Sequence, residues 1–281
     1  MEIRITRLSI LLSLMLVPSV TVAQGGSVID QLYVSYIYAA VMGSGNYTIE
    51  NRQISMLRIP FAYTQRELTE EQSGLKWKLP VTIGYDSLNY PDWLSRFIED
   101  ELATLTLLPG VETFHRVSDH WIIKPFTNMG AAYDFSRHET ILMAILGIRA
   151  LGCWTYADTS EIRVGSSARY ATEYQLQSDR RNGFTMLEVG ADYRRDIKLK
   201  IMDHATNTGV YCRTQFFLPE WRVGQPRENL QTRLHLVHEI GASIGLRHPR
   251  KILGIPISRV RAGVSFGDRI LGWTVGTDFP F

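Results

Sequence analysis

The segment Ile270–Phe281 alternates apolar and polar side chains and ends on an aromatic residue. In an extended strand, successive side chains point to opposite sides, so a period of two sorts them onto two faces. The polar face would carry Gly272, Thr274, Gly276 and Asp278, and the apolar face would carry Leu271, Trp273, Val275, Phe279 and Phe281. The segment is therefore predicted to be a β-strand with two chemically different faces.

The same period of two recurs along most of the chain, which predicts an all-β fold. It is clear in Met56–Tyr63, Lys76–Asp86, Ile123–Asp134, Arg163–Leu176, Thr185–Arg194, Arg233–Arg247 and Ile257–Phe266. It is weaker in Ala103–His115, Glu139–Leu151 and Val210–Phe217.

Two architectures share this pattern. A soluble β-sandwich buries its apolar face, whereas a transmembrane β-barrel turns that face to lipid and its polar face to the lumen. Segments of roughly 9 to 11 residues with Trp or Tyr near their ends favour the barrel. Such aromatic residues are Trp77, Tyr85, Tyr133, Tyr170, Tyr174, Tyr193 and Trp273. We therefore predict an antiparallel, up-and-down transmembrane barrel, with the soluble secreted sandwich as the alternative.

The strand count expected from the sequence is twelve, with ten as the alternative. Eleven segments can be read directly, and single-chain bacterial barrels usually have an even number of strands. The missing strand is expected before Ile54 or from a split within Thr185–Met202.

The amino-terminal region is expected to be processed. Arg4 and Arg7 precede the apolar run Leu8–Val17, and small residues up to Ala23 follow, which is the layout of a secretory signal peptide. We predict a signal peptide at residues 1–23, an N-terminal segment at 24–52 and the barrel at 53–281. Apolar residues at helical spacing in Ile29–Val41 predict a short helix that partly occupies the lumen, and Asp92–Leu102 is a second helical candidate.

The net charge and the cysteine content bear on possible partners and on disulfide formation. The formal net charge is +2, without a basic tract, so no nucleic-acid partner is expected. Cys153 and Cys212 both follow the signal peptide, where a disulfide is permitted, and the sequence leaves open whether they pair.

We expect no catalytic activity, cofactor or metal. No histidine is followed by Ser at the His-x-Ser spacing, which would put a nucleophile and its base on one face of a strand. The Asp119-His120 and Asp203-His204 pairs are adjacent, so their side chains would point to opposite faces. His138-Glu139 and His238-Glu239 lack the second His of the zinc-protease motif.

The polar faces of the predicted strands carry many charged side chains that would project into the lumen. One reading is a selectivity surface for anionic solutes; the other is an internal network of ion pairs that stiffens the barrel. Because both signs are interspersed, we favour the second reading. The predicted lumen residues are Arg58, Lys76, Lys78, Arg163, Arg169, Glu173, Glu188, Asp192, Arg194, Arg233, Glu239, Arg259 and Arg261. By the same alternation His238 falls on the lipid face, where we expect a bulge or shifted register to remove it.

An alternating strand that ends on Phe resembles the terminal strand of bacterial outer-membrane barrels. That resemblance implies that Leu271, Trp273, Val275, Phe279 and Phe281 form the signal read by the barrel-assembly machinery. A leading helix followed by about twelve strands resembles the translocator domain of autotransporters, in its solitary form without a passenger. The resemblance implies a monomeric, porin-like protein in the outer membrane of a Gram-negative bacterium, with membrane lipid and the assembly machinery as partners. It also implies a narrow pore or translocator-type barrel; the alternative is a closed scaffold whose surface loops bind a partner or a cell surface.

Overall fold

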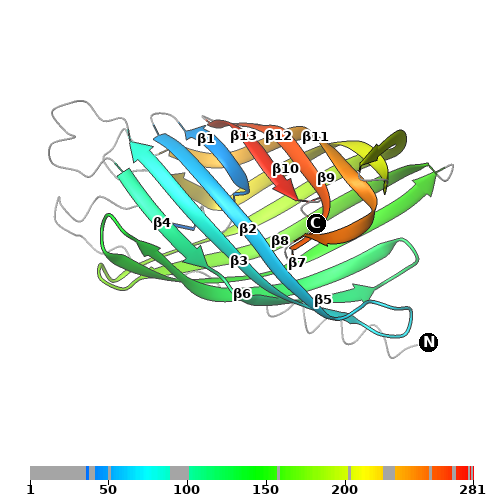
Figure 1. The fold of residues 1–281 in the computed structure, drawn as a ribbon. Helices are drawn as coiled ribbons and strands as arrows, with labels where there is room; N and C mark the ends of the chain where they lie inside the picture. Colours follow the sequence, from blue (N-terminus) through cyan, green and yellow to red (C-terminus); the bar gives the residue numbers. More distant parts are fainter. Residues whose placement is uncertain are drawn as a thin grey trace.

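A computed structural model of the chain shows a closed antiparallel β-barrel (Figure 1). The structure describes residues 36–37, 42–49, 52–88, 101–156, 159–201, 204–223, 232–252, 255–267, 270–277, 279 and 281. The predicted signal peptide, and the second helical candidate up to residue 100, lie outside these residues.

The strands follow one another around the barrel. They are β1 (Ser44–Ile49), β2 (Arg52–Arg66), β3 (Gly74–Leu88), β4 (Glu101–Leu107), β5 (Gly110–Arg116), β6 (Trp121–Asp134), β7 (Glu139–Tyr156), β8 (Ser160–Gln175), β9 (Arg180–Ile201), β10 (His204–Val223), β11 (Thr232–Ile252), β12 (Ile255–Gly267) and β13 (Ile270–Thr277). All but β4 and β5 pair with both of their neighbours in the chain, β1 and β13 counting as neighbours. Since β3 and β6 flank β4 and β5, they pair with both of these strands. Pairing of β1 with β13 joins the first strand to the last and closes the barrel.

Twelve strand positions make up the wall, which confirms the predicted count. β4 and β5 both pair with β3 on one side and β6 on the other, so they share one position. Leu108 and Pro109 separate them, and Pro cannot donate to a ladder. The alternation in Ala103–His115 is weak because Leu108 and Pro109 interrupt it.

The missing strand is β1, which lies before Ile54 as one of the two expectations had it. Thr185–Met202 is not split, because β9 runs unbroken from Arg180 to Ile201. The barrel begins at Ser44, earlier than the predicted boundary at residue 53. Glycine, serine and asparagine in the strand Ser44–Ile49 obscure its alternation.

The outward face of the wall is apolar, and the closed sheet rules out the alternative of a sandwich. Large hydrophobic side chains that are more than a third exposed occur on strands all around the barrel, for example Leu57, Ile83, Leu146, Val189, Val210, Ile240, Val264 and Leu271. His238 also faces outward, where its Nδ1 hydrogen-bonds Thr214 Oγ1 at 3.0 Å. The bulge or register shift expected to move His238 off this face does not do so, because pairing is regular from Leu236 to Leu246 with β10 and from Val237 to Gly245 with β12. A register shift in the β10–β11 pair follows only beyond Leu236.

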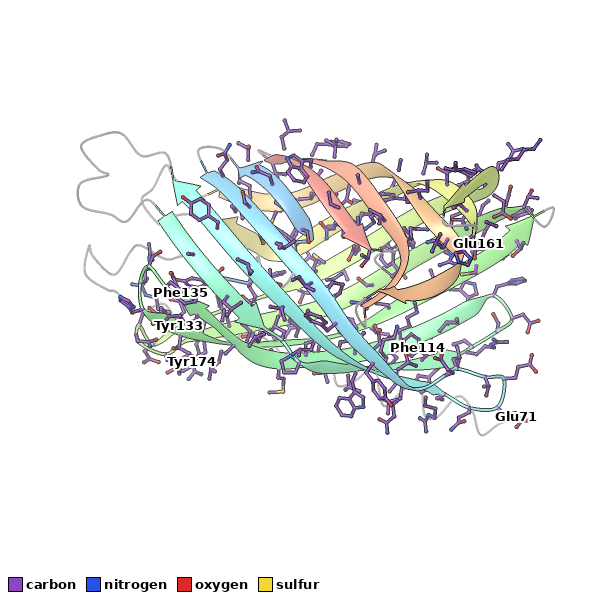
Figure 2. The ribbon with its side chains drawn as sticks, in the orientation of Figure 1. Glu71, Phe114, Tyr133, Phe135, Glu161 and Tyr174 are labelled. Atoms are coloured by element: carbon purple, nitrogen blue, oxygen red, sulfur yellow. The ribbon has the colours of Figure 1, made fainter. Side chains whose placement is uncertain are left out.

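The connections between strands lie at the two ends of the barrel. At one, here called the turn end, four-residue turns (135–138 and 176–179) join β6 to β7 and β8 to β9. Figure 2 shows Tyr133, Phe135 and Tyr174 gathered at this end. The opposite, loop end carries the β2–β3 and β5–β6 connections, residues 67–73 and 117–120. Figure 2 shows Glu71 and Glu161 near it.

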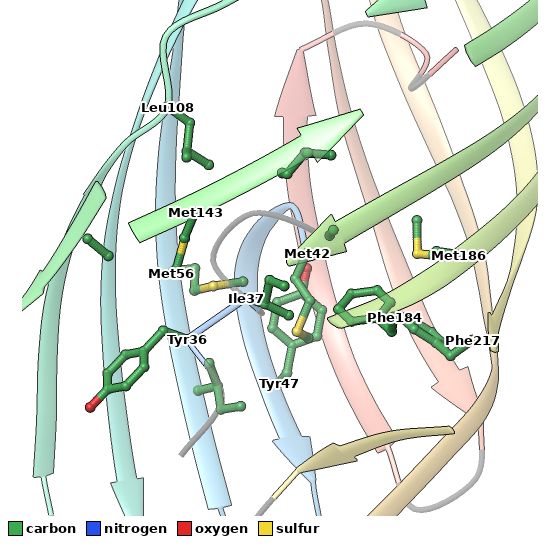
Figure 3. Packing of buried hydrophobic residues seen from close by; sticks show 14 of the residues in the cluster. Tyr36, Ile37, Met42, Tyr47, Met56, Leu108, Met143, Phe184, Met186 and Phe217 are labelled. Carbon is green, nitrogen blue, oxygen red and sulfur yellow. The ribbon is translucent and has the colours of Figure 1, made fainter. Parts of the chain in front are cut away.

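An apolar cluster fills part of the barrel interior (Figure 3). Met56, Met143, Phe184 and Phe217 come from the wall, while Tyr36 and Ile37 come from the chain ahead of β1. Tyr36 is 2% exposed and Ile37 0%. These two are the described part of the predicted segment Ile29–Val41, and they lie inside the barrel; the rest of that segment lies outside the described residues.

Among the described residues, no helix is long and apolar enough to span a membrane.

Candidate functional site in the barrel lumen

Five charged side chains of alternating sign cross the inner wall, one from each of five consecutive strands. They are Arg169 of β8, Glu188 of β9, Arg213 of β10, Glu239 of β11 and Arg261 of β12, here called the charged row. All five are at most 9% exposed. Each of these five strands points one of the five side chains into the lumen. Ion pairs between neighbouring side chains therefore link the five strands in sequence.

Glu239 accepts hydrogen bonds on both carboxylate oxygens. Its Oε1 receives Tyr211 Oη at 2.6 Å, Arg261 Nη1 at 2.5 Å and Thr274 Oγ1 at 2.9 Å. Its Oε2 receives Arg213 Nε at 2.9 Å as well as Arg213 Nη2. Burying a charge is costly unless it is paired and fully hydrogen-bonded, and Glu239 meets both conditions.

Arg213 connects the two carboxylates of the charged row. Its Nη1 donates to Glu188 Oε1 at 2.9 Å, while its Nε donates to Glu239. Glu188 Oε2 is bonded in turn by Arg169 Nη2 and by Ser167 Oγ. Three cations thus share two carboxylates, which leaves the row with a net positive charge.

A second charged group lies on β3, β5 and β7, of which β7 is next to β8 and its Arg169. Glu112 Oε1 is 3.2 Å from Lys78 Nζ and 2.5 Å from Arg149 Nη1. The cationic heads of Lys78 and Arg149 also lie over the ring of Phe126, at 5.0 and 4.3 Å from its centre. This group again holds two cations around one carboxylate.

Near the loop end the charged side chains form smaller groups than the charged row. Arg194 Nε is 2.6 Å from Asp192 Oδ2, and Arg163 Nε is 3.0 Å from Glu161 Oε1. Arg259 donates to Ser243 Oγ at 2.7 Å and to Asn207 Oδ1. Lys76 Nζ lies 5.3 Å from the centre of the Phe114 ring.

Acidic residues at the turn end hold the chain that leads into β1. Tyr36 Oη donates to Asp134 Oδ2 at 2.7 Å, and the Tyr36 amide donates to Glu173 Oε2 at 2.9 Å. Asp134 is 0% exposed and Glu173 1%. Burial and the neighbouring Asp134 carboxylate raise the pKa of the Tyr36 phenol above its ordinary value.

The end of the chain turns into the lumen instead of continuing the outward face. Leu271, Trp273 and Val275 point outward as predicted, but Phe279 and Phe281 are 7% and 6% exposed and pack with Leu151 and Tyr211. A Cβ built on Gly165 would clash with the Phe281 ring. The prediction that all five share one face is wrong beyond Thr277, where β13 ends.

Most predicted lumen residues do point inward. Arg169, Glu188, Glu239 and Arg261 form the charged row, while the other members are divided among the groups above or, for Arg58, line a cavity beside them. Arg233 lies in β11, and its side chain lies outside the described set.

Sequence reasoning missed Arg213, Arg149 and Glu112, although each is central to its group. In β10 the inward positions include Tyr211 and Phe217 and the outward ones include Cys212 and Thr214, so neither face reads as clearly polar. Arg149 and Glu112 lie in the two other weakly alternating segments. None of the predicted lumen residues lies on β5, β7 or β10, so two-residue spacing had no starting point on these strands.

The two cysteines do not pair in the structure. Both thiols are free: Cys212 is exposed on the outer face, and Cys153 is half-buried beside Phe279 and Phe281. Within the described residues there is no group of three or more side chains able to hold a metal ion.

No family model matches the chain, and no curated protein matches it. A search of solved structures finds a similar barrel, the β domain of the Bordetella autotransporter BrkA. The match has a TM-score of 0.49 and 12% sequence identity, and it covers 83% of this chain and 93% of that one.

Proposed function

We propose that the chain is an integral outer-membrane barrel, a narrow translocator-type pore whose lumen holds Tyr36 and Ile37 from ahead of β1 and Phe279 and Phe281 from beyond β13. The observation that carries the membrane part is the outward apolar face. Monomeric soluble proteins rarely expose so much contiguous apolar surface, whereas a lipid-facing barrel requires it. Aromatic residues border this face, with Tyr63, Trp77 and Tyr156 toward the loop end and Tyr85 and Tyr133 toward the turn end.

The lumen contents support a pore that is closed in its resting form. Tyr36 and Ile37 enter the turn-end half, and Phe279 and Phe281 fill part of the other half. The charged row lies on the wall beside them. A solute could pass only if one of these internal segments moved aside.

A closed scaffold is the second candidate, and the charged row favours it. Ion pairs that link five neighbouring strands would make the wall rigid, as a scaffold for surface loops requires. Such a barrel would have no need to release its internal segments.

Two measurements separate these proposals. Unboiled outer-membrane fractions should give a fast-migrating band on a gel that boiling removes; protein that is soluble and shows no shift would end the membrane proposal. The purified full chain and a variant lacking residues 24–43 are then compared in planar bilayers. A pore predicts conductance that rises with the deletion, and a scaffold predicts negligible conductance from both.

A further inference from the structure

A cavity of about 90 Å³ lies in the lumen between the two charged groups. Four cationic side chains from four strands line it: Arg58 of β2, Lys78 of β3, Arg149 of β7 and Arg169 of β8. Its described lining contains no carboxylate, and Phe126 and Ile145 supply apolar walls.

The carboxylates that pair with three of these cations, Lys78, Arg149 and Arg169, are each shared between two cations. Glu112 serves both Lys78 and Arg149, and Glu188 serves both Arg169 and Arg213. The ion pairs of these three side chains therefore do not cancel their positive charge, and the apolar walls weaken its screening by water.

Two donors on this wall have no acceptor. Within the described part of the chain, the Nε atoms of Arg149 and Arg169 are buried and have no hydrogen-bond partner. Arg169 is 9% exposed. Buried donors are nearly always satisfied in folded proteins, so these two unsatisfied donors on cavity-lining residues favour an acceptor group nearby.

We propose that this cavity binds a free small oxyanion of the size of inorganic phosphate. Guanidinium groups present their N–H donors in a planar fork that matches the oxygens of phosphate, sulfate or carboxylate, whereas a halide offers no paired oxygens. The inference rests on the proposed function, because it assigns the solute class that the lumen receives.

A path of positive charge leads from the loop end to the cavity. Lys76 lies one inward position before Lys78 on β3, and Lys124 of β6 lies 5.8 Å from the same Phe114 ring that Lys76 covers. Lys124 Nζ also donates to the main-chain oxygen of Phe281 at 3.1 Å. The path therefore passes the residue that fills this half of the lumen.

The test is calorimetric titration of the folded full chain, in detergent and at low ionic strength, with inorganic phosphate and separately with chloride. Lys78→Gln and Arg58→Gln each remove one cavity cation. Arg163→Gln is the matched control, since it removes a β8 cation that pairs with Glu161 away from the cavity. The heat-sensitive gel band verifies that each variant is folded.

The proposal expects saturable one-to-one phosphate binding and much weaker chloride binding. Loss of one charged hydrogen-bonding group should weaken phosphate binding about tenfold in each folded cavity variant, with binding by Arg163→Gln unchanged. Absence of saturable phosphate binding, equal binding of chloride, or equal weakening by Arg163→Gln would overturn it. Phosphate binding without conductance would reject the pore and keep the site; conductance without phosphate binding would do the reverse.

Discussion

Arg213 and Glu239 lie directly opposite each other on β10 and β11, and Arg213 Nε is 2.9 Å from Glu239 Oε2. The guanidinium also reaches Glu188 on the other neighbouring strand. One side chain thus links three strands on the inner wall. We therefore expect this pair to make the largest contribution of the charged row to the stability of the barrel.

Glu239→Gln should destabilise the barrel by about 3–5 kcal/mol, because it leaves the buried Arg213 and Arg261 without their shared charge. Denaturant unfolding in detergent measures the change. Glu161→Gln is the control, since Glu161 is 28% exposed and its pairs should contribute less than about 1 kcal/mol. Equal losses in the two variants would show that the row does not carry this weight.

Gly165→Val should expel Phe281 from the lumen, since any Cβ at this position overlaps the Phe281 ring. Carboxypeptidase should then remove the end of the chain faster than in the wild type. Gly43→Ala is the matched control, because a Cβ there meets its nearest neighbour at an ordinary 3.7 Å. If both variants resist digestion as the wild type does, Phe281 is not held in this position.

Tyr36→Phe should loosen the segment ahead of β1 while the barrel stays folded, because it removes the bond to Asp134 and about 1 kcal/mol with it. Limited proteolysis from the amino-terminal side reports the loosening. Tyr174→Phe, which loses a bond to the exposed Asp179, should leave the cleavage pattern unchanged.

The same bond should weaken in alkali. The raised pKa of Tyr36 means that its contribution to stability is complete below the unfolded value of about 10 and declines as pH rises from there toward the folded value. Proteolysis of the wild type should therefore approach that of Tyr36→Phe only above pH about 10. A transition near neutral pH would contradict this assignment.

Val264→Arg should impair membrane insertion by about 2–4 kcal/mol if its position is near the bilayer midplane. Val264 is 50% exposed on the outer face of β12. Val117→Arg is the control, as Val117 is 61% exposed but lies in the β5–β6 connection. Refolding yield into lipid vesicles distinguishes them, and similar yields would argue against a lipid-facing wall.

The fold was predictable because its dominant signal is local. A period of two in segments such as Lys76–Asp86 reports which face meets which environment, and a closed barrel applies that rule to every strand. The signal weakens where both faces are mixed, as around Arg213, or where a strand is broken, as at Pro109. Residues at those places were missed for that reason.

The contents of the lumen could not be predicted in the same way. The period of two places Phe279 and Phe281 with Leu271, but it applies only while the chain stays extended, and the strand ends at Thr277. The space that Phe281 occupies depends on Gly165, which is more than 100 residues earlier in the sequence. Contacts of that range carry no local signature.

The joint between β1 and β13 has a consequence for folding. It consists of six residue pairs, whereas β7 and β8 form sixteen. This pairing also closes the longest stretch of chain between any two paired strands. Closing it therefore has the highest entropic cost, and it should be the slowest pairing to form. Hairpins such as β7–β8 should therefore assemble first and the joint last. Inside the lumen, Lys124 of β6 holds Phe281, which follows β13. This second contact between β13 and the rest of the wall should slow the reopening of the closed barrel.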